Sequence, residues 1–370
     1  MTLALAPPLG AASPTWRVTA HVAVARAGLL SIAPNGLLAA VVSQSARPEV
    51  LWLSTVTGRI TGHVPLPAVP TAAVFTTSGS ALAVTYGDCA FGPVPCGEAT
   101  HTTLLRAGGG IEASVTTGAG SGALAAVPDS ADVLVAADGA GVVDVLDTAS
   151  ARVVAAIEVG SGILASLAVA PGGREAAVAN VTAGTVTLLD LADDRAAAVA
   201  NVSEEAGAMA FDRTFPYLFV GQAQGQDVDV VHTPGGAVVR AVDAAQDVGP
   251  LVDLAGEDVL AAGSLTAQTV ALFAVSSDGM LSYGAKRVVS VGAAAAGRIT
   301  ALAVADDGQE LLAAAEQGVS VLAAPTFTST ERILPQTLGG PPTAMVAAQT
   351  HAVVLAGGRV DILSLVGGDK

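Results

Sequence analysis

Three ionisable residues close to predicted apolar strands are the chain's best candidates for acid–base chemistry. Asp212 and Arg213 directly follow an apolar run, and Asp253 interrupts another one. A carboxylate can accept or donate a proton, and a guanidinium can bind an anionic substrate. The remaining residues of these runs are small and apolar. Too few ionisable side chains are therefore left to supply a general acid, a general base and the contacts that hold a substrate. The sequence therefore predicts no catalytic residue, and these three groups are kept for an enzyme alternative.

Metal binding is disfavoured by the spacing of the candidate ligands. The five histidines are scattered and none forms a pair at metal-ligand spacing; they are His21, His63, His101, His232 and His351. Asp227 and Asp229 share one face of a predicted strand, so a weak calcium site is conceivable, but solvated turn carboxylates are the favoured interpretation. We expect no metal and no cofactor.

The two cysteines lie close together in a loop rich in glycine and proline. Cys89 and Cys96 bound a six-residue spacer in the segment GDCAFGPVPCGEAT. A disulfide between them indicates an oxidising compartment, so the prediction is an extracytoplasmic or secreted protein, although the first residues show no evident targeting signal. The alternative is a pair of inert thiols.

A repeat of short apolar strands supplies the scaffold for these residues. Between Ser166 and Val202, apolar runs of strand length alternate with turns, as in one four-stranded antiparallel sheet. The turn between the first two strands recurs at intervals of about 42 residues, with two longer intervals. It falls at Asn35-Gly36, Ser78-Gly79, Asp129-Ser130, Gly172-Gly173, Thr214-Phe215, Gly256-Glu257, Asp307-Gly308 and Gln349-Thr350.

Eight such turns predict an all-β propeller of eight four-stranded blades; seven blades would require one unit to be misread. The last unit is one strand short, and the extended segment from Arg17 to Val24 can complete it by pairing with Val360 to Leu365. The predicted domains are an N-terminal extension over 1–14 and a single β-propeller domain over 15–370.

Composition and charge make several partners unfavourable. Residues are 52% hydrophobic and 13% charged, and the net charge of −16 repels nucleic acid and anionic lipid. No apolar run of 18 or more residues free of charges and turns occurs, so no membrane insertion is expected. A protein partner remains.

One stretch carries a resemblance to a known family. Val178-Ala179-Asn180, followed by Gly184-Thr185-Val186 and a strand ending in Asp190, resembles the YVTN-type β-propeller repeat. The match is close in about a quarter of the chain and loose elsewhere. The resemblance implies the propeller fold but no single activity, because the family includes surface and secreted binding proteins, lactonase-like enzymes and subunits of quinoprotein amine dehydrogenases.

Short polar residues end the predicted third strands of several blades. They are Ser54, Asp147, Asp190, His232 and Ser364. Such side chains can accept hydrogen bonds from the following turn, so we expect a structural role for them.

Two lengthened blades give the ring its asymmetry and suggest where a partner binds. The second contains Phe91, Pro93 and Pro95, which would form a constrained apolar knob; the sixth is lengthened around Tyr283. The leading prediction is a non-enzymatic propeller that binds a protein partner within a larger assembly, with these four residues as contacts. The alternative is an enzyme or enzyme subunit of the lactonase or quinoprotein kind.

Overall fold

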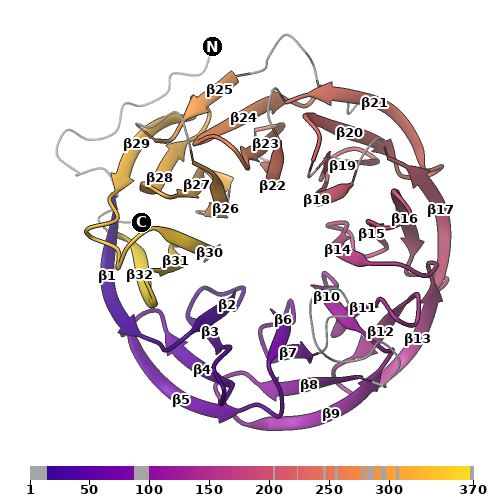
Figure 1. Cartoon of the computed structure of the whole chain (residues 1–370), viewed down its shortest axis with the longest axis horizontal. Helices are drawn as coiled ribbons and strands as arrows, with labels where there is room; N and C mark the ends of the chain where they lie inside the picture. The colour runs from indigo at the N-terminus through magenta and orange to yellow at the C-terminus, as the bar shows by residue number, and fades with distance from the viewer. Residues whose placement is uncertain are drawn as a thin grey trace, which may run out of the picture.

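The computed structural model shows a ring of eight four-stranded antiparallel sheets (Figure 1). It describes residues 15–86, 100–202, 205–222, 224–244, 247–254, 257–276, 281, 287–292, 297–305 and 308–366. The sheets are blades around a central axis, so the predicted eight-bladed propeller is confirmed. Within the described ranges there is no helix long and apolar enough to cross a membrane.

Blades are numbered in chain order. Blade 1 contains β2 (Ala27–Ile32), β3 (Leu38–Ser43), β4 (Glu49–Ser54) and β5 (Arg59–Pro65), and blade 2 contains β6 (Pro70–Phe75), β7 (Ala81–Tyr86), β8 (Thr100–Arg106) and β9 (Ile111–Thr117). Blade 3 contains β10 (Ser121–Ala126), β11 (Asp132–Ala137), β12 (Val142–Asp147) and β13 (Arg152–Glu158), and blade 4 contains β14 (Leu164–Val169), β15 (Glu175–Asn180), β16 (Thr185–Asp190) and β17 (Arg195–Asn201). Blade 5 contains β18 (Ala206–Phe211), β19 (Tyr217–Gln222), β20 (Asp227–His232) and β21 (Ala237–Asp243), and blade 6 contains β22 (Val248–Leu254), β23 (Val259–Ser264), β24 (Thr269–Ala274) and β25 (Arg287–Ser290). Blade 7 contains β26 (Ile299–Ala305), β27 (Glu310–Ala315), β28 (Gly318–Ala323) and β29 (Thr328–Ile333), and blade 8 contains β30 (Pro342–Ala348), β31 (His351–Ala356), β32 (Arg359–Val366) and β1 (Thr15–Ala23).

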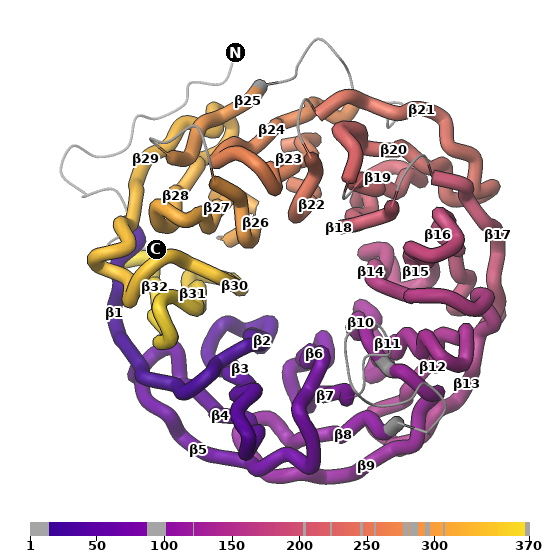
Figure 2. The backbone as a smooth tube through the Cα atoms, in the orientation of Figure 1, coloured from indigo at the N-terminus to yellow at the C-terminus, as the bar shows by residue number. Residues whose placement is uncertain are grey.

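Each blade runs from an innermost first strand to an outermost fourth strand (Figure 2). Because the strands are antiparallel, connections between blades and loops between second and third strands lie at one end of the disc, here called the link face. Turns between first and second strands and between third and fourth strands lie at the other end, the turn face. All eight predicted first-to-second turns fall between the expected strands.

The first strand of the chain closes the ring by completing the last blade. β1 pairs antiparallel with β32, with Arg17 opposite Ser364 and Val22 opposite Val360. The pairing that the sequence predicts is therefore confirmed. Trp16 is 1% exposed there, its backbone N–H donates to Glu331 Oε2 at 2.6 Å, and its indole N–H donates to Glu310. These contacts hold the closing strand against blade 7 as well as blade 8.

Apolar side chains between neighbouring blades form the core. Eight clusters of buried residues are described, and each joins two adjacent blades. Leu134 and Val145 of blade 3, for example, pack with Leu164 and Val178 of blade 4. Both faces of the second and third strands are buried, so these strands are continuous Ala, Val and Leu runs rather than alternating ones. Small side chains allow the twisted sheets to approach closely around the axis.

Candidate functional site

Asp212, Arg213 and Asp253 lie together at the turn face, between blades 5 and 6. Asp212 Oδ1 accepts hydrogen bonds from the backbone N–H of Thr214 and Phe215, at 2.7 and 2.8 Å, so this carboxylate closes its own turn. Burial is the largest cause that raises the pKa of Asp253, to about 7; the negative Asp212 raises it further and Arg213 opposes the shift. Asp253 Oδ2 is buried and has no hydrogen-bond partner within the described residues.

Asp253 is the exception at its position in the ring. It pairs with the second residue of the second strand of its blade, and the seven equivalent residues are apolar: Ile32, Phe75, Ala126, Val169, Phe211, Val304 and Ala347. The fold therefore does not require a carboxylate there. The structure does bring the three predicted candidates together, but neither of the two hollows described below includes them.

The histidines are scattered over four blades, as their spacing predicts; His21 and His351 share blade 8. His21 bonds to Asp361 at 2.6 Å and His63 to Glu49 at 3.2 Å, while the His232 ring lies 5.5 Å from that of Tyr217. Burial lowers the pKa of His351, which is the first residue of β31. Across the described ranges, no three His, Cys, Asp or Glu residues are arranged to hold a metal ion.

The predicted turn-capping role is confirmed at three of the five third-strand ends. Ser54 Oγ accepts from Thr57 N–H at 3.2 Å, Asp147 Oδ1 from Ala149 N–H at 2.9 Å, and Asp190 Oδ1 from Ala192 N–H at 3.1 Å. His232 instead packs on Tyr217, and the Ser364 hydroxyl lies 3.0 Å from that of Thr19.

Sequence reasoning missed a set of buried polar residues in the middle of the third strands. Asp144 Oδ2 accepts from Gly118 N–H at 2.6 Å, Asp361 Oδ2 accepts from Gly339 N–H at 2.9 Å, and Ser320 Oγ donates to Val291 O at 2.9 Å. Each occupies the third position of its strand and bonds to the connection that enters its own blade at the link face. We call these side chains link pins.

Gly118 shows why the pinned connection approaches so closely. A Cβ at this position would lie 2.6 Å from the Cβ of Ala137, so only glycine fits without displacement. The sequence signal for a link pin is an Asp or Ser two residues after the start of the third strand, with a small residue in the connection.

Asp229 corrects one sequence expectation. It was expected to be a solvated turn carboxylate, but it is 0% exposed and accepts from Gln222 Nε2 at 3.1 Å. Asp227, two residues earlier, begins the strand and is partly exposed. The buried position results from strand register, which places the third residue of β20 between blades.

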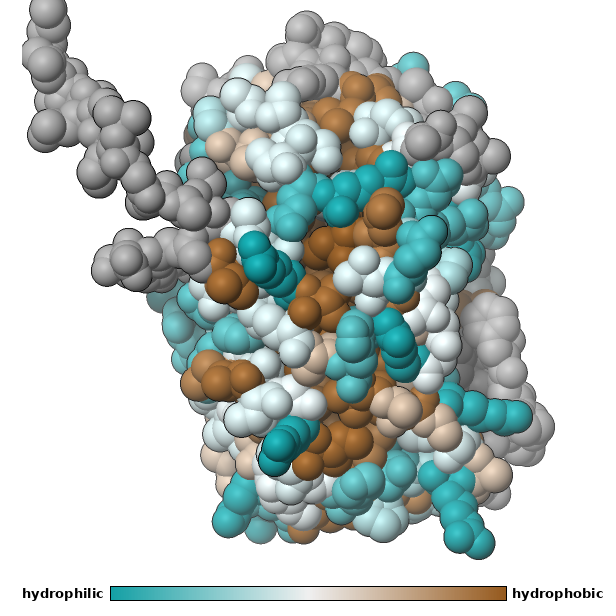
Figure 3. Space-filling view, turned by 90° about the vertical axis from the view of Figure 1, so that its left-hand side faces the viewer, coloured by the Kyte–Doolittle hydropathy of each residue, from teal (hydrophilic) through white to brown (hydrophobic). Residues whose placement is uncertain are grey.

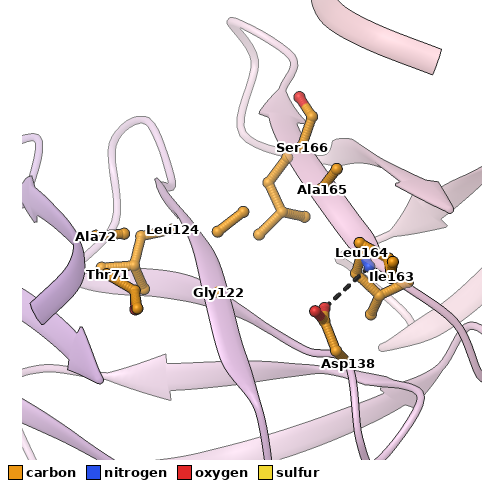
Figure 4. A pocket seen from close by; sticks show the side chains of 11 residues that line it. Thr71, Ala72, Gly122, Leu124, Asp138, Ile163, Leu164, Ala165 and Ser166 are labelled. Atoms are coloured by element: carbon orange, nitrogen blue, oxygen red, sulfur yellow. Dashed lines mark hydrogen bonds between the residues drawn. The ribbon is translucent and has the colours of Figure 1, made fainter. Parts of the chain in front are cut away.

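Two hollows open at the link face near the axis. One, of about 470 Å³, is lined by Thr71, Gly122 and Asp138 together with residues 163–167, and Asp138 Oδ1 accepts from Leu164 N–H at 2.9 Å (Figure 4). The other, of about 460 Å³, lies across blades 5 to 8 and includes Arg298. Both are lined by small residues together with a few larger apolar ones, and every innermost strand has a register irregularity near its start.

The predicted contact residues and the predicted disulfide lie outside the described residues. This applies to Phe91, Pro93, Pro95 and Tyr283, and to Cys89 and Cys96. The strand ends that bound residues 87–99 lie on the link face, whereas β24 and β25, which bound the Tyr283 segment, have those ends on the turn face. The extension predicted over 1–14 is also outside the described ranges, so these assignments stay predictions.

Comparisons with known proteins support the fold and no more specific relationship. No family model matches the chain, and no curated protein matches it. Among solved structures, the chain is similar to the C-terminal WD40 domain of Sif2, with a TM-score of 0.70 and 11% sequence identity. The match covers 96% of this chain and 99% of that domain. The chain is also similar to a chain of hydrazine synthase from Kuenenia stuttgartiensis, with a TM-score of 0.60 and 14% sequence identity. That match covers 92% of this chain and 96% of the other.

At such low identity these structures show that the chain is a β-propeller and say nothing of its activity. The YVTN repeat type stays a resemblance of the stretch around Asn180, since no family model supports it.

Proposed function

We propose that this protein is a non-enzymatic β-propeller that binds a protein partner through its link face, as one component of a larger assembly. The supporting observation is the composition of the 470 Å³ hollow, which is lined by small residues and by leucine and isoleucine and has one charged residue, Asp138. That carboxylate already accepts a hydrogen bond from the strand that enters blade 4. A shallow surface of this kind suits recognition of shape better than acid–base catalysis.

The neighbouring structures are compatible with such a role without specifying it. A WD40 domain and a hydrazine synthase chain share the fold, and propellers in general present loops from several blades on one face. The net charge of −16 favours a partner with a basic contact surface. β7 ends at this face, and Phe91, Pro93 and Pro95, which come after it in the sequence, remain our proposed contacts.

Filling the hollow tests this proposal. A Cβ at Gly122 would be no closer than 4.0 Å to any neighbouring atom, so Gly122→Phe should place its ring in the hollow without displacing the blade. We expect proteins that co-purify with the full-length chain under native conditions to be lost in this variant. Gly172→Phe is the matched control, because Gly172 has open space around it at the turn face.

Two outcomes would contradict the proposal. Co-purification that survives Gly122→Phe, or that is equally lost in Gly172→Phe, would place the contact elsewhere. A lactone-hydrolysing activity of the purified chain that Gly122→Phe abolishes would favour the enzyme alternative, and a co-purifying subunit with a quinone cofactor would favour the dehydrogenase form of it.

The enzyme alternative is supported by the cluster of Asp212, Arg213 and Asp253. A carboxyl with a pKa raised to about 7 is suited to proton transfer at neutral pH. Asp253→Asn should abolish any activity of this kind while it leaves partner binding at the link face unchanged. An activity that survives this substitution would exclude Asp253 as its acid or base.

An extracytoplasmic or secreted location is proposed from Cys89 and Cys96. Peptide mass mapping of native protein, digested without reductant, should find these residues linked to each other. Free thiols at both positions in native material would argue against export.

A further inference from the structure

The outermost strands differ among blades at one repeated position. Seven of them contain a register irregularity that leaves one extra, exposed residue on the outer surface of the disc. This residue is polar in blades 8, 1, 2 and 7 and apolar in blades 3, 4 and 5. The polar set is Thr19, Thr61, Glu112 and Thr330, and the apolar set is Val154, Ala197 and Val239.

The next outward-facing residue repeats the difference. Two residues further along, the first group of blades has His21, His63, Ser114 and Arg332, whereas blades 3 to 5 have Ala156, Val199 and Ala241. Val154 is 58% exposed, Val199 is 56% exposed and Val239 is 45% exposed. We call the six apolar residues of blades 3 to 5 the rim strip: Val154, Ala156, Ala197, Val199, Val239 and Ala241.

The three strands that contain the rim strip are neighbours around the ring. β17 contacts both β13 and β21 along the right-hand side of the ring in Figure 1. The turn before β21 lies on β17, because a Cβ at Gly236 would be 2.9 Å from the Cβ of Ala198. The opposite side of the disc, with β1 and β29, shows many hydrophilic side chains among the apolar ones (Figure 3).

The fold does not account for these apolar residues. Four blades with the same backbone irregularity have a polar residue at the equivalent position, so solvent-exposed valine is not needed there. Continuous exposed apolar surface in a folded protein commonly marks an interaction site.

The charges at the edge of the rim strip indicate what binds it. β13 ends in Glu158 and β21 in Asp243, both exposed, while β17 ends in the neutral Asn201 between them. At the opposite end of the same strands, Arg195 is paired with Asp190 at 3.1 Å and with Asp193 at 3.3 Å. The strands also contain Arg152, at the turn-face end of β13, and Arg240, which lies between Val239 and Ala241 in β21. The two carboxylates are therefore at the link-face end of the strip.

We propose that the rim strip docks a segment of a partner protein that has an apolar face and lysine or arginine residues at the end that meets Glu158 and Asp243. A second copy of this chain fits less well, because it would add its own net charge of −16 to an acidic border. The acidic border also repels anionic lipid. This surface is separate from the link face, so the proposal goes beyond the function proposed above.

Photo-cross-linking from the rim strip identifies the occupant. A photoreactive amino acid replaces Val199 in the full-length protein, in the cells that normally make it, and the cross-linked peptide is sequenced by mass spectrometry. We expect an apolar segment flanked by Lys or Arg. Cross-links only between copies of this chain, only to lipid, only to segments without basic residues, or to nothing above background would overturn the proposal.

Affinity measurements then test the mode of binding. The cross-linked segment is synthesised as a labelled peptide, and its Kd for the purified full chain is measured by fluorescence anisotropy. The triple variant V154T/V199T/V239T keeps the β-branched shape, and we expect it to raise Kd by about tenfold or more. The double variant E158K/D243K should also raise Kd by about tenfold, and Kd of the parent chain should rise with salt.

Exposed valines outside the strip provide the matched control. Val56 is 65% exposed and Val69 is 51% exposed, so the double variant V56T/V69T removes comparable apolar surface elsewhere. It should leave Kd unchanged. Equal weakening by the control, or an affinity that neither rim variant alters, would contradict docking on the strip. Gly122→Phe should leave this binding intact, which separates failure here from failure of the link-face proposal.

Discussion

At the scale of single residues, Asp253 shows how one substitution in a repeat can make stability depend on pH. Its folded pKa of about 7 lies above the usual aspartate pKa of 3.8, because burial and the nearby Asp212 disfavour the charged form. A group with a raised pKa binds its proton more tightly in the folded state. The free energy of unfolding of the parent protein should therefore fall, because of this group, as pH rises from about 4 to about 7. Above pH 7 the contribution of the group should no longer change.

Asp253→Val restores the apolar character of the seven equivalent positions. We expect the variant to be more stable than the parent by about 1–3 kcal/mol at pH 8, because no buried carboxylate oxygen is left without a partner. The difference should shrink as pH falls toward 4, because the folded-state carboxyl then carries its proton and no buried charge remains. Denaturant unfolding of both proteins at these two pH values measures it, and a difference independent of pH would refute the assignment.

At the scale of strands and connections, the three link pins couple the incoming connections of blades 3, 7 and 8 to the centres of these blades. Asp144→Ala leaves the Gly118 N–H without its acceptor and should destabilise the fold by about 1–3 kcal/mol. Asp144→Asn keeps an acceptor oxygen, and because burial raises the pKa of Asp144, it also removes a desolvated charge. Its effect should therefore be much smaller than that of the alanine variant in the same unfolding experiment.

Asp147→Ala is the comparison within the same strand. This carboxylate caps a turn at the strand end, where water can replace its bonds to Ala149 and Ser150. We expect a loss of about 0.5–1 kcal/mol. A loss as large as that of Asp144→Ala would mean that the pinned connection contributes no more than an ordinary turn.

The same two aspartates show what sequence patterns can and cannot predict. The turns, the strands and the pairing of residues 17–24 with the end of the chain follow from local chemistry, since turn residues and apolar runs mark their own positions. A link pin and a turn cap have the same side chain three residues apart, and only the register of the strand buries one of them. The rim strip was not predicted because the extra residue in each outermost strand shifts the alternation of exposed and buried positions.

For the whole molecule, closure by β1 should decide whether the ring forms. Trp16 is buried between blades 7 and 8 and bonds to Glu310 and Glu331. Trp16→Ala should cost about 3–5 kcal/mol, because it removes a large buried side chain together with the indole N–H that donates to Glu310, whereas the backbone N–H that donates to Glu331 is kept. Thermal unfolding followed by calorimetry measures the loss. Val366→Ala, on an exposed residue paired with Thr15 in the same closing strand pair, should change stability by less than about 0.5 kcal/mol.

Closure of the ring by its first strand has a consequence for biosynthesis. The partner of β1 is β32, which is synthesised after every other strand of the ring, so blade 8 stays incomplete until β32 has been made. Until then the nascent protein carries an unpaired strand at each side of the gap, and such edges are open to pairing with other nascent chains. Premature termination after blade 7 would leave Trp16 without its pocket and yield an open arc instead of a truncated ring.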